Sequence, residues 1–233
     1  MKIALLGYGK MGKEIEKIAL QRGHEIVIKF SGVEKFDITT ADIGIDFSIP
    51  TIAYSNITSC IENNVPVVSG TTGWLKNYDK VVDLCTQKNG AFIYASNFSL
   101  GVNIFFELNK QLAKMMSTLN DYQVSIEEIH HTKKLDAPSG TAITLAEGII
   151  ENSQKKEWQL DKSTTNEVIP IIAKRIDDVP GTHTITYSSD IDTIDITHTA
   201  HNRKGFALGA VIAAEWLVDK KGVHTMKDVL NIR

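Results

Sequence analysis

The first 94 residues alternate short apolar runs with segments of helical periodicity, and this alternation constrains the fold more than any other feature. Parallel strands need long crossover connections, which are usually helices, so the pattern predicts a parallel sheet flanked by helices. The first crossover places its apolar residues on one helical face, and Gly23 follows it as a left-handed stop. The expected strands are residues 2–6, 25–30, 43–47, 65–69 and 91–95.

The pattern changes after residue 97. A helix is expected over 101–119, and the alternating segments that follow are typical of an antiparallel sheet. Residues 207–218 return to helical spacing and are expected to pack on the first domain, whereas the polar residues 151–166 are interpreted as a mobile excursion without assigned function. The alternating segments are 121–130, 167–176, 182–188 and 191–199.

These patterns predict an α/β chain with two domains. A Rossmann-like parallel sheet is expected over residues 1–97, completed by a C-terminal helix at about 205–233. An α+β domain on an open mixed or antiparallel sheet is expected over 98–204. With 233 residues and 42% hydrophobic content, the chain can bury an ordinary core in each.

The charge balance limits the classes of partner. The chain has 25 basic and 28 acidic residues, so no long-range field draws it to nucleic acid or to a membrane. The first apolar run is far too short for a signal peptide or a membrane span. Two cysteines cannot form a disulfide framework, and a reducing, cytoplasmic location is expected.

A glycine-rich turn directly follows the first expected strand. Glycines let the backbone approach a pyrophosphate, and the next helix directs free N–H groups at the anion. This spacing is a weak signal alone, but its position between a strand and a helix favours a dinucleotide site. The turn is Gly7, Tyr8, Gly9, Lys10, Met11 and Gly12.

The acidic residue that commonly binds the adenosine ribose at the end of the second strand is missing. Lys29 lies there instead and suits a 2′-phosphate, although a solvated strand end is an equally good interpretation. The preference between NADH and NADPH therefore stays open.

Further turns follow later strands, where ligands bind in open parallel sheets. We expect the nicotinamide half of the cofactor to lie near them, although each is also compatible with an ordinary turn between a strand and a helix. Asp46 and Ser48 could equally be caps for a helix beginning at Pro50. The expected cofactor residues in these turns are Gly70, Thr71, Thr72, Ala95, Ser96, Asn97 and Phe98.

The segment from Glu128 to Thr141 concentrates groups that suit an anionic substrate. An expected strand delivers His130 and His131 to its end, and Lys134 adds a positive charge. Ser139 is a plausible helix N-cap that would leave backbone N–H groups to bind a carboxylate.

A histidine with an ordinary pKa near 6.5 can be protonated when an anion arrives and then release that proton, so either histidine could be a general acid. Local capping and metal binding are the alternatives. No further Cys/His cluster accompanies the pair at ligand spacing, so no metal is expected. His183, His198 and His201, which lie on or next to the alternating segments, are interpreted as structural.

The same segment resembles the signature E-x-H-H-x-x-K-x-D-A-P-S-G-T-A of the 4-hydroxy-tetrahydrodipicolinate reductase (dihydrodipicolinate reductase) family. That signature is long and specific. The glycine turn is one residue shorter than the family's commoner form, and the region after the second strand is abbreviated. The resemblance otherwise extends over residues 7–12, 46–50, 70–73, 95–103, 128–142, 181–184, 196–198, 203–210 and 227–230.

The resemblance implies roles for individual residues. His130 is similar to the family's general acid/base and Lys134 to its proton-donating lysine, while His131, Gly140 and Thr141, with Ser139 beside them, resemble substrate contacts. It also implies reduction of a cyclic dicarboxylate by NADH or NADPH in diaminopimelate and lysine synthesis, in a cytoplasmic homotetramer joined through its C-terminal sheets.

Two other classes of function are compatible with a dinucleotide fold. One is a different dehydrogenase of a small anionic substrate, for example one that uses a thiohemiacetal, which requires an activated cysteine. Cys60 and Cys85 lie in helical patterns and are poor candidates. The other is a dinucleotide sensor without chemistry, which has no need of the His130 to Lys134 segment.

Overall fold

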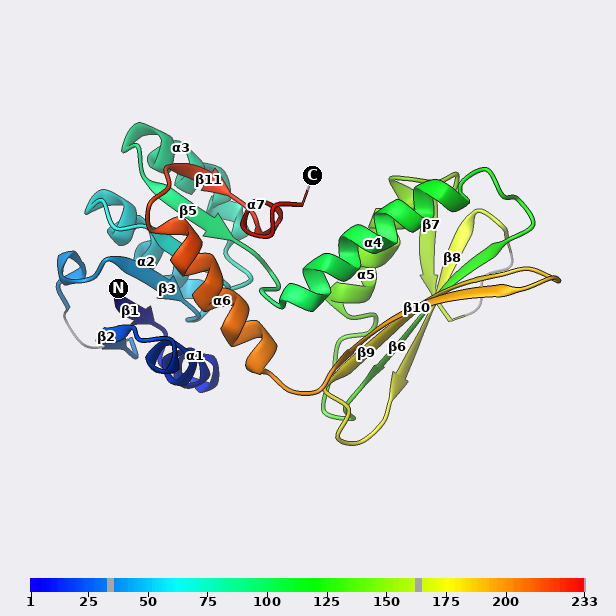
Figure 1. The fold of residues 1–233 in the computed structure, drawn as a ribbon, viewed down its shortest axis with the longest axis horizontal. Coiled ribbons are helices and arrows are strands. Elements are labelled where there is room, and N and C mark those ends of the chain that lie inside the picture. Colours follow the sequence, from blue (N-terminus) through cyan, green and yellow to red (C-terminus); the bar gives the residue numbers. More distant parts are fainter. Residues whose placement is uncertain (33–35, 162–164, 233) are drawn as a thin grey trace. The chain divides into compact units, whose positions relative to one another are not determined.

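The computed structural model of the chain describes residues 1–32, 36–161 and 165–232, which divide into two compact units (Figure 1). Unit 1 comprises Met1–Asn103 and Lys204–Arg233, and unit 2 comprises Ile104–Arg203. These divisions follow residues 103 and 203, whereas the sequence placed the domain boundaries after 97 and 204.

Unit 1 contains a six-stranded sheet in the spatial order β11–β5–β4–β3–β1–β2, and every neighbouring pair is parallel. The first five strands along the chain confirm the prediction. The sixth, β11, was not predicted because its three residues form no apolar run. The strands are β1 (Lys2–Leu6), β2 (Glu25–Phe30), β3 (Ile43–Asp46), β4 (Val67–Ser69), β5 (Ala91–Tyr94) and β11 (Gly222–His224).

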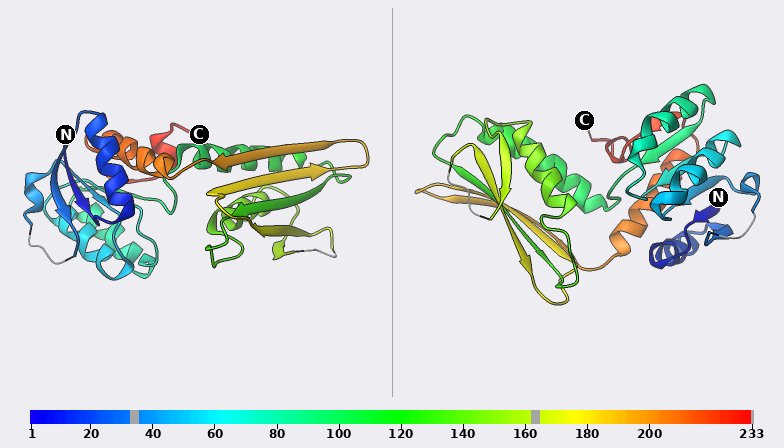
Figure 2. Two further views of the ribbon diagram at one scale, coloured as in Figure 1. Left: turned by 90° about the horizontal axis from the view of Figure 1, so that it is seen from below. Right: turned by 180° about the vertical axis from the view of Figure 1, so that it is seen from behind.

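Helices cover both faces of this sheet, because alternate side chains of its strands point to opposite faces (Figure 2). Ile3 and Leu5 of β1 pack with α1 and α6, whereas Ala4 and Leu6 pack with α2 and α3. The packing of α6 on this sheet confirms the prediction for residues 207–218. The helices are α1 (Lys10–Gln21), α2 (Pro50–Glu62), α3 (Tyr78–Gln87), α6 (Lys204–Leu217) and α7 (Met226–Val229).

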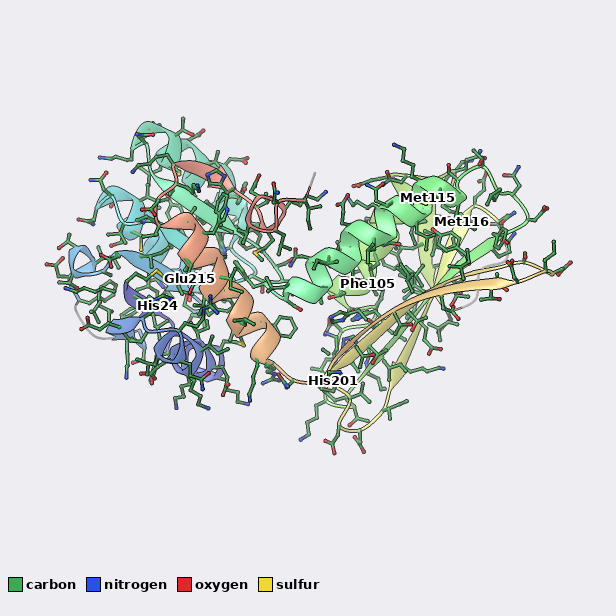
Figure 3. The ribbon with its side chains drawn as sticks, in the orientation of Figure 1. His24, Phe105, Met115, Met116, His201 and Glu215 are labelled. Atoms are coloured by element: carbon green, nitrogen blue, oxygen red, sulfur yellow. The ribbon has the colours of Figure 1, made fainter. Side chains whose placement is uncertain are left out.

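Local signals explain where α1 ends. Gly23 follows it at φ +82°, the left-handed conformation predicted for this glycine. The end of α1 is joined to α6 by Glu215, which accepts hydrogen bonds from the Arg22 guanidinium at 2.7 Å and lies 2.7 Å from His24 Nε2 (Figure 3). This cluster holds two helices of the same layer together.

Unit 2 contains a five-stranded sheet in the order β10–β9–β6–β8–β7. The β10–β9 and β9–β6 pairs are antiparallel, but β6–β8 and β8–β7 are parallel. The sheet is therefore mixed, which confirms the predicted mixed or antiparallel sheet; the alternating pattern alone suggested antiparallel strands, because alternation does not encode strand direction. The strands are β6 (Gln123–His130), β7 (Glu157–Leu160), β8 (Val168–Arg175), β9 (Gly181–Ser188) and β10 (Thr193–Ala200).

The segment 151–166 is not simply an excursion. It contains β7, whose Trp158 packs against the core of unit 2. Residues 162–164 of that segment lie outside the described residues. The polar composition hid the strand because β7 is an edge strand with only one half-buried face.

Two helices, α4 (Leu100–Met116) and α5 (Gly140–Ile150), cover one face of the second sheet. Phe105 and Met116 of α4 are buried in this core, whereas Met115 is 69% exposed (Figure 3). The other face carries cross-strand polar pairs such as Thr184 with Thr197, whose hydroxyls lie 3.0 Å apart. Among the described residues, no helix is long and apolar enough to cross a membrane.

Candidate functional site

The glycine turn after β1 is shaped by contacts within the protein at two of its three glycines. A Cβ on Gly7, which has φ +110°, would lie 2.2 Å from the Phe47 carbonyl oxygen, and one on Gly12 would lie 2.3 Å from the Gly7 carbonyl oxygen. Gly9 differs, because a Cβ there would meet nothing within 4 Å. The fold therefore needs Gly7 and Gly12, whereas Gly9 leaves space for something outside the chain.

That space is part of a cavity of about 440 Å³ in unit 1. It lies at the carboxyl ends of β1, β3 and β4, where the strand order reverses between β1 and β3 and where ligands bind in such sheets. The cavity brings together six residues that the sequence assigned to the cofactor: Gly9, Lys10, Met11, Gly70, Thr71 and Thr72. Phe47, Ser48 and Pro50 complete its lining.

Asp46 organises the loops around this cavity. Its fully buried carboxylate accepts hydrogen bonds from Ser48 Oγ at 2.6 Å, Asn56 Nδ2 at 3.0 Å, Ser69 Oγ at 2.8 Å and Thr71 Oγ1 at 2.7 Å. Burial raises the pKa of Asp46, and these donors counteract that effect.

The interpretation of Asp46 and Ser48 as helix caps is wrong. The N-cap of α2 is Ile49, which makes no side-chain capping bond. The polar groups of the loop instead bond one another and Thr71, because Asp46 is the last residue of a fully buried strand and its carboxylate needs partners there.

The turn after β5 contributes less to this cavity than the sequence suggested. Phe98 is 1% exposed and its ring lies 5.7 Å from that of Phe47, so its side chain belongs to the core. Asn97 accepts a hydrogen bond from the Ser99 amide, and Ala95 and Ser96 stand outside the cavity lining.

Lys29 is exposed near the end of β2, as one of its two interpretations expected, but it is paired with an acid. Its ammonium lies 2.6 Å from Glu16 Oε1 and 5.3 Å from the centre of the Tyr8 ring, and the Tyr8 hydroxyl donates a hydrogen bond to Glu16. The hydrogen bond from Lys29 lowers the pKa of Glu16. A positive charge from Lys29 is therefore available to a 2′-phosphate only in competition with Glu16.

In unit 2, the signature segment folds into one site. β6 ends at the buried His130, and His131 is half-buried beside it. Lys134 donates a hydrogen bond to Asp136 Oδ2 at 2.8 Å in the loop that follows.

Ser139 is the N-cap of α5, as predicted, and accepts a hydrogen bond from the Ala142 amide at 3.2 Å. The amides of Gly140 and Thr141 precede the first intrahelical bond and point out of the helix end. Gly140 is exposed, and a Cβ there would meet nothing within 4 Å. Like Gly9, it leaves space for a ligand.

Three residues beside His130 were not predicted from the sequence to belong to this site. Glu128, fully buried, accepts the Ser139 amide at 3.0 Å and the Arg175 guanidinium at 3.1 Å. His183 on β9 lies 3.1 Å from Ser139 Oγ and 3.7 Å from Glu128 Oε2, so its interpretation as a satisfied structural histidine missed its place beside His130. Spacing along one strand could have indicated Glu128, whereas strand pairing alone brings Arg175 and His183 to the site.

The environment sets the protonation of this cluster. Burial alone would raise the pKa of Glu128, but its contacts with His183 and Ser139 lower it to about 2. Burial and the positive groups nearby lower the pKa of His130 to about 4, against the opposing effect of Glu128. At neutral pH the carboxylate is therefore charged and His130 is neutral.

Ligand atoms of Glu128, His130 and His183 lie within 4.8 Å of one another, a spacing that could hold a metal. The sequence pattern did not indicate that His183, from β9, would join this cluster. Arg175 and the Ser139 amide already bind Glu128, and a guanidinium beside the carboxylate opposes a cation, so we interpret the cluster as an acid–base network.

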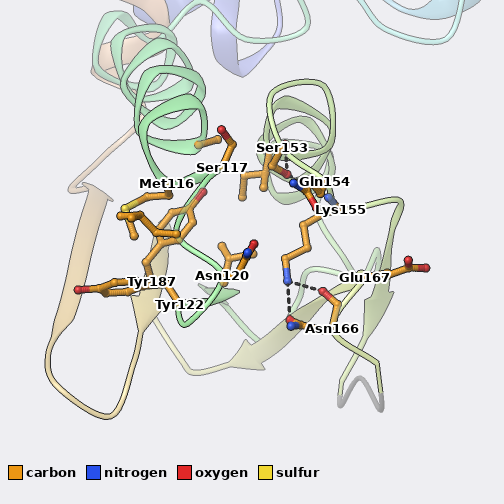
Figure 4. Close-up of a pocket in the computed structure, with 14 residues that line it drawn as sticks. Met116, Ser117, Asn120, Tyr122, Ser153, Gln154, Lys155, Asn166, Glu167 and Tyr187 are labelled. Atoms are coloured by element: carbon orange, nitrogen blue, oxygen red, sulfur yellow. Dashed lines mark hydrogen bonds between the residues drawn. The ribbon is translucent and has the colours of Figure 1, made fainter.

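A second cavity in unit 2 contains none of the predicted site residues. It occupies about 160 Å³, and Lys155 enters it and donates hydrogen bonds to Asn166 (Figure 4). Tyr187 also lines this cavity, and burial raises its pKa to about 12.

The two cysteines are inert by environment. Cys60 and Cys85 are fully buried, and burial raises the pKa of each thiol. Neither can present a thiolate to a substrate, which argues against thiohemiacetal chemistry.

Comparisons with known proteins point to the same family in both halves of the chain. Residues 29–98 match the family model described as dihydrodipicolinate reductase, N-terminus, and residues 101–230 match the model for its C-terminus. A 4-hydroxy-tetrahydrodipicolinate reductase of Christiangramia forsetii is 60% identical, covering 99% of this chain and 98% of the relative. One from Thermosipho africanus is 34% identical, with coverage of 99% and 98%.

Solved structures share the fold. A dipicolinate-bound dihydrodipicolinate reductase from Paenisporosarcina sp. TG-14 superposes with a TM-score of 0.78 at 22% identity, covering 100% of this chain and 99% of that one. An aspartate semialdehyde dehydrogenase from Vibrio cholerae superposes less well, with a TM-score of 0.56, 12% identity, and coverage of 93% and 98%. Since both family models and whole-length relatives match, the chain belongs to the dihydrodipicolinate reductase family.

Proposed function

We propose that this chain reduces 4-hydroxy-tetrahydrodipicolinate to tetrahydrodipicolinate with NADH or NADPH, a step of diaminopimelate and lysine synthesis. One observation carries the proposal. The segment Glu128 to Thr141 brings buried polar side chains and bordering cations together in a chain 60% identical over its length to a reductase of that name. In the overall reaction, substrate, reduced nicotinamide and one proton give product, oxidised nicotinamide and water.

The substrate is a cyclic dicarboxylate, and unit 2 offers two kinds of group for it. The amides of Gly140 and Thr141 lie at the positive end of α5, which favours a carboxylate. Lys134 and His131 add a charge and a ring nitrogen at the loop after β6. In support, the similar Paenisporosarcina structure holds dipicolinate, a planar dicarboxylate.

His130 or Lys134 supplies the proton. His130 is neutral in the free protein, since its pKa is about 4, so a bound dianion must raise that pKa before the ring can donate. Lys134 contributes positive charge directly, because its ammonium can exchange Asp136 for a substrate carboxylate. These groups stabilise the negative charge that develops on the ring when hydride arrives at carbon 4.

The cofactor is proposed to lie in unit 1. Gly9 and the first turn of α1 would receive the pyrophosphate, and the open position of the Gly9 Cβ fits this close approach. Gly70, Thr71 and Thr72 would meet the nicotinamide half. When bound, the reduced nicotinamide supplies the hydride.

These two sites assign a different role to each unit. Unit 1 is proposed as the dinucleotide-binding domain and unit 2 as the substrate-binding and oligomerisation domain. A cytoplasmic homotetramer joined through the second sheet is proposed, and the uncovered face of that sheet supports it.

The test is a coupled assay with freshly generated 4-hydroxy-tetrahydrodipicolinate, following loss of reduced-nicotinamide absorbance with NADH and NADPH in parallel. Turnover should depend on substrate and persist after thiol alkylation, because both cysteines are buried. Absence of turnover with both cofactors, despite their binding, would favour a dinucleotide sensor instead.

A further inference from the structure

We infer that Glu128 and Arg175 are positioning residues for this reaction: the carboxylate orients His130, and the guanidinium holds the loop that carries Lys134. The inference rests on the proposed function, because it assumes that His130 and Lys134 act on the substrate. Neither residue needs to touch the substrate for this role.

Glu128 faces the buried side of the His130 ring. The two residues are separated by one position on β6, so they point to the same face of the sheet. Glu128 Oε2 lies 3.6 Å from His130 Nδ1, a buried atom with no hydrogen-bond partner among the described residues. A carboxylate at that distance stabilises the tautomer with its proton on Nδ1 and leaves Nε2 as the reactive nitrogen.

The opposite edge of the ring is kept open by a glycine. A Cβ on Gly181, the first residue of β9, would lie 3.2 Å from His130 Nε2, tighter than nine in ten real contacts. Glu128 therefore lies at one ring nitrogen of His130, and the glycine leaves room beside the other.

Arg175 links that carboxylate to the catalytic loop. It pairs with His130 in the parallel β6–β8 register, so its side chain lies on the same face. Its Nη2 donates to Glu128 Oε1 at 3.1 Å and to the Asp136 carbonyl at 2.6 Å, and its Nε donates to the Lys134 carbonyl at 3.4 Å. One planar guanidinium thus fixes the loop backbone on both sides of residue 135.

A purely stabilising ion pair is the alternative. It would leave kcat unchanged in folded variants, so kcat measured beside the titration of His130 distinguishes the two. The titratable and charged groups facing this ring are Glu128, His183, Lys134 and Arg175. Arg175 lowers the pKa of His130 and Glu128 raises it, so their neutral variants should shift this pKa in opposite directions. A general loss of stability would not produce opposite shifts.

The experiment uses Arg175→Lys, Arg175→Gln and Glu128→Gln in the full chain. We expect kcat to fall about 10- to 100-fold in each, with the cofactor KM within about twofold of wild type, because misplacing catalytic groups has this effect. The pKa of His130, measured by NMR, should rise in Arg175→Gln and fall in Glu128→Gln. Arg175→Lys keeps the charge, so it should lose kcat with little change in that pKa.

Lys156→Gln is the matched control. Lys156 precedes β7 of the same sheet and pairs with Glu167 Oε1 at 2.7 Å in an exposed ion pair outside the site. This variant should keep wild-type kcat and His130 titration.

Wild-type kcat in both Arg175 variants, or shifts of the His130 pKa in the same direction, would overturn the inference. An inactive wild type would refute the proposed reaction instead. The titration does not require turnover, so same-direction shifts would overturn the inference in that case too.

Discussion

At the scale of single residues, the surroundings of His130 favour its neutral form. His130 is 8% exposed, and its neighbours include His183, Lys134 and Arg175. Glu128 opposes their effect on its pKa. A substrate with two carboxylates brings negative charge that raises the pKa of His130. His130 is therefore protonated, and able to donate a proton, when the substrate is bound.

Replacing the proposed proton donors should reduce turnover. His130→Ala and Lys134→Ala are each expected to lower kcat by about 10²- to 10⁴-fold, the usual contribution of a positioned general acid. NADPH binding, measured by fluorescence titration, should be unchanged, since both residues lie in unit 2. Wild-type kcat in both variants would contradict the assignment.

The depressed pKa values also make the fold sensitive to acid. His130 takes up its proton near pH 6.5 in the unfolded chain but only near pH 4 in the folded chain, so its stabilising contribution is complete above 6.5 and is lost as the pH falls toward 4. The ionised Glu128 also stabilises the fold, because its pKa falls from 4.5 in the unfolded chain to about 2 in the folded chain. This contribution is lost as the pH falls from 4.5 toward 2.

Urea unfolding of the wild type at pH 7.5, 5.5 and 4.5 should therefore give a decreasing free energy of unfolding. His130→Asn, which does not titrate, should show a smaller decrease from pH 7.5 to 4.5. Identical decreases in wild type and variant would show that His130 is not the group responsible.

At the scale of elements, the turn after β1 contains one glycine that the fold requires and another that is proposed to serve cofactor binding. Gly7→Ala should destabilise the fold by more than about 2 kcal/mol, because Gly7 has φ +110° and a Cβ there would lie 2.2 Å from the Phe47 carbonyl oxygen. Gly9→Ala should change stability by less than about 0.5 kcal/mol.

The prediction for Gly9→Ala is instead a loss of cofactor affinity, by about tenfold or more, because the new Cβ occupies the space proposed for the pyrophosphate. Thermal melting and cofactor titration of the two variants test this contrast. Unchanged affinity in Gly9→Ala would place the pyrophosphate elsewhere.

Local patterns predicted most of the elements and the signature site. The first five strands of unit 1 lie in short, mainly apolar runs, and Ser139 caps α5 where a serine was expected. Other features depend on pairing between distant segments. The direction of β6 relative to β8 and the arrival of Arg175 and His183 beside Glu128 leave no local trace. The short strands β7 and β11 carry too few buried residues to stand out.

At the scale of the whole molecule, one face of the second sheet lacks a covering helix layer among the described residues. Threonine hydroxyls on this face lie beside apolar side chains such as Ile172, which is 40% exposed. Such a mixed face suits contact with another copy of the same sheet.

A homotetramer predicts a mass four times the 25.8 kDa of one chain in light scattering coupled to size exclusion. A charge inserted among the paired hydroxyls, as in Thr184→Lys, should lower that mass, because like charges would meet across a symmetric interface. A wild-type mass of one chain at micromolar concentration would contradict the homotetramer.

The central claim is that this chain transfers a hydride from a reduced nicotinamide to the ring of 4-hydroxy-tetrahydrodipicolinate. The most direct measurement uses nicotinamide cofactor deuterated at the transferable position and follows the label into the product by mass spectrometry and NMR. We expect one deuterium at ring carbon 4 with the wild type, formed much more slowly with Lys134→Ala. Cofactor oxidation that leaves the product unlabelled would contradict the claim.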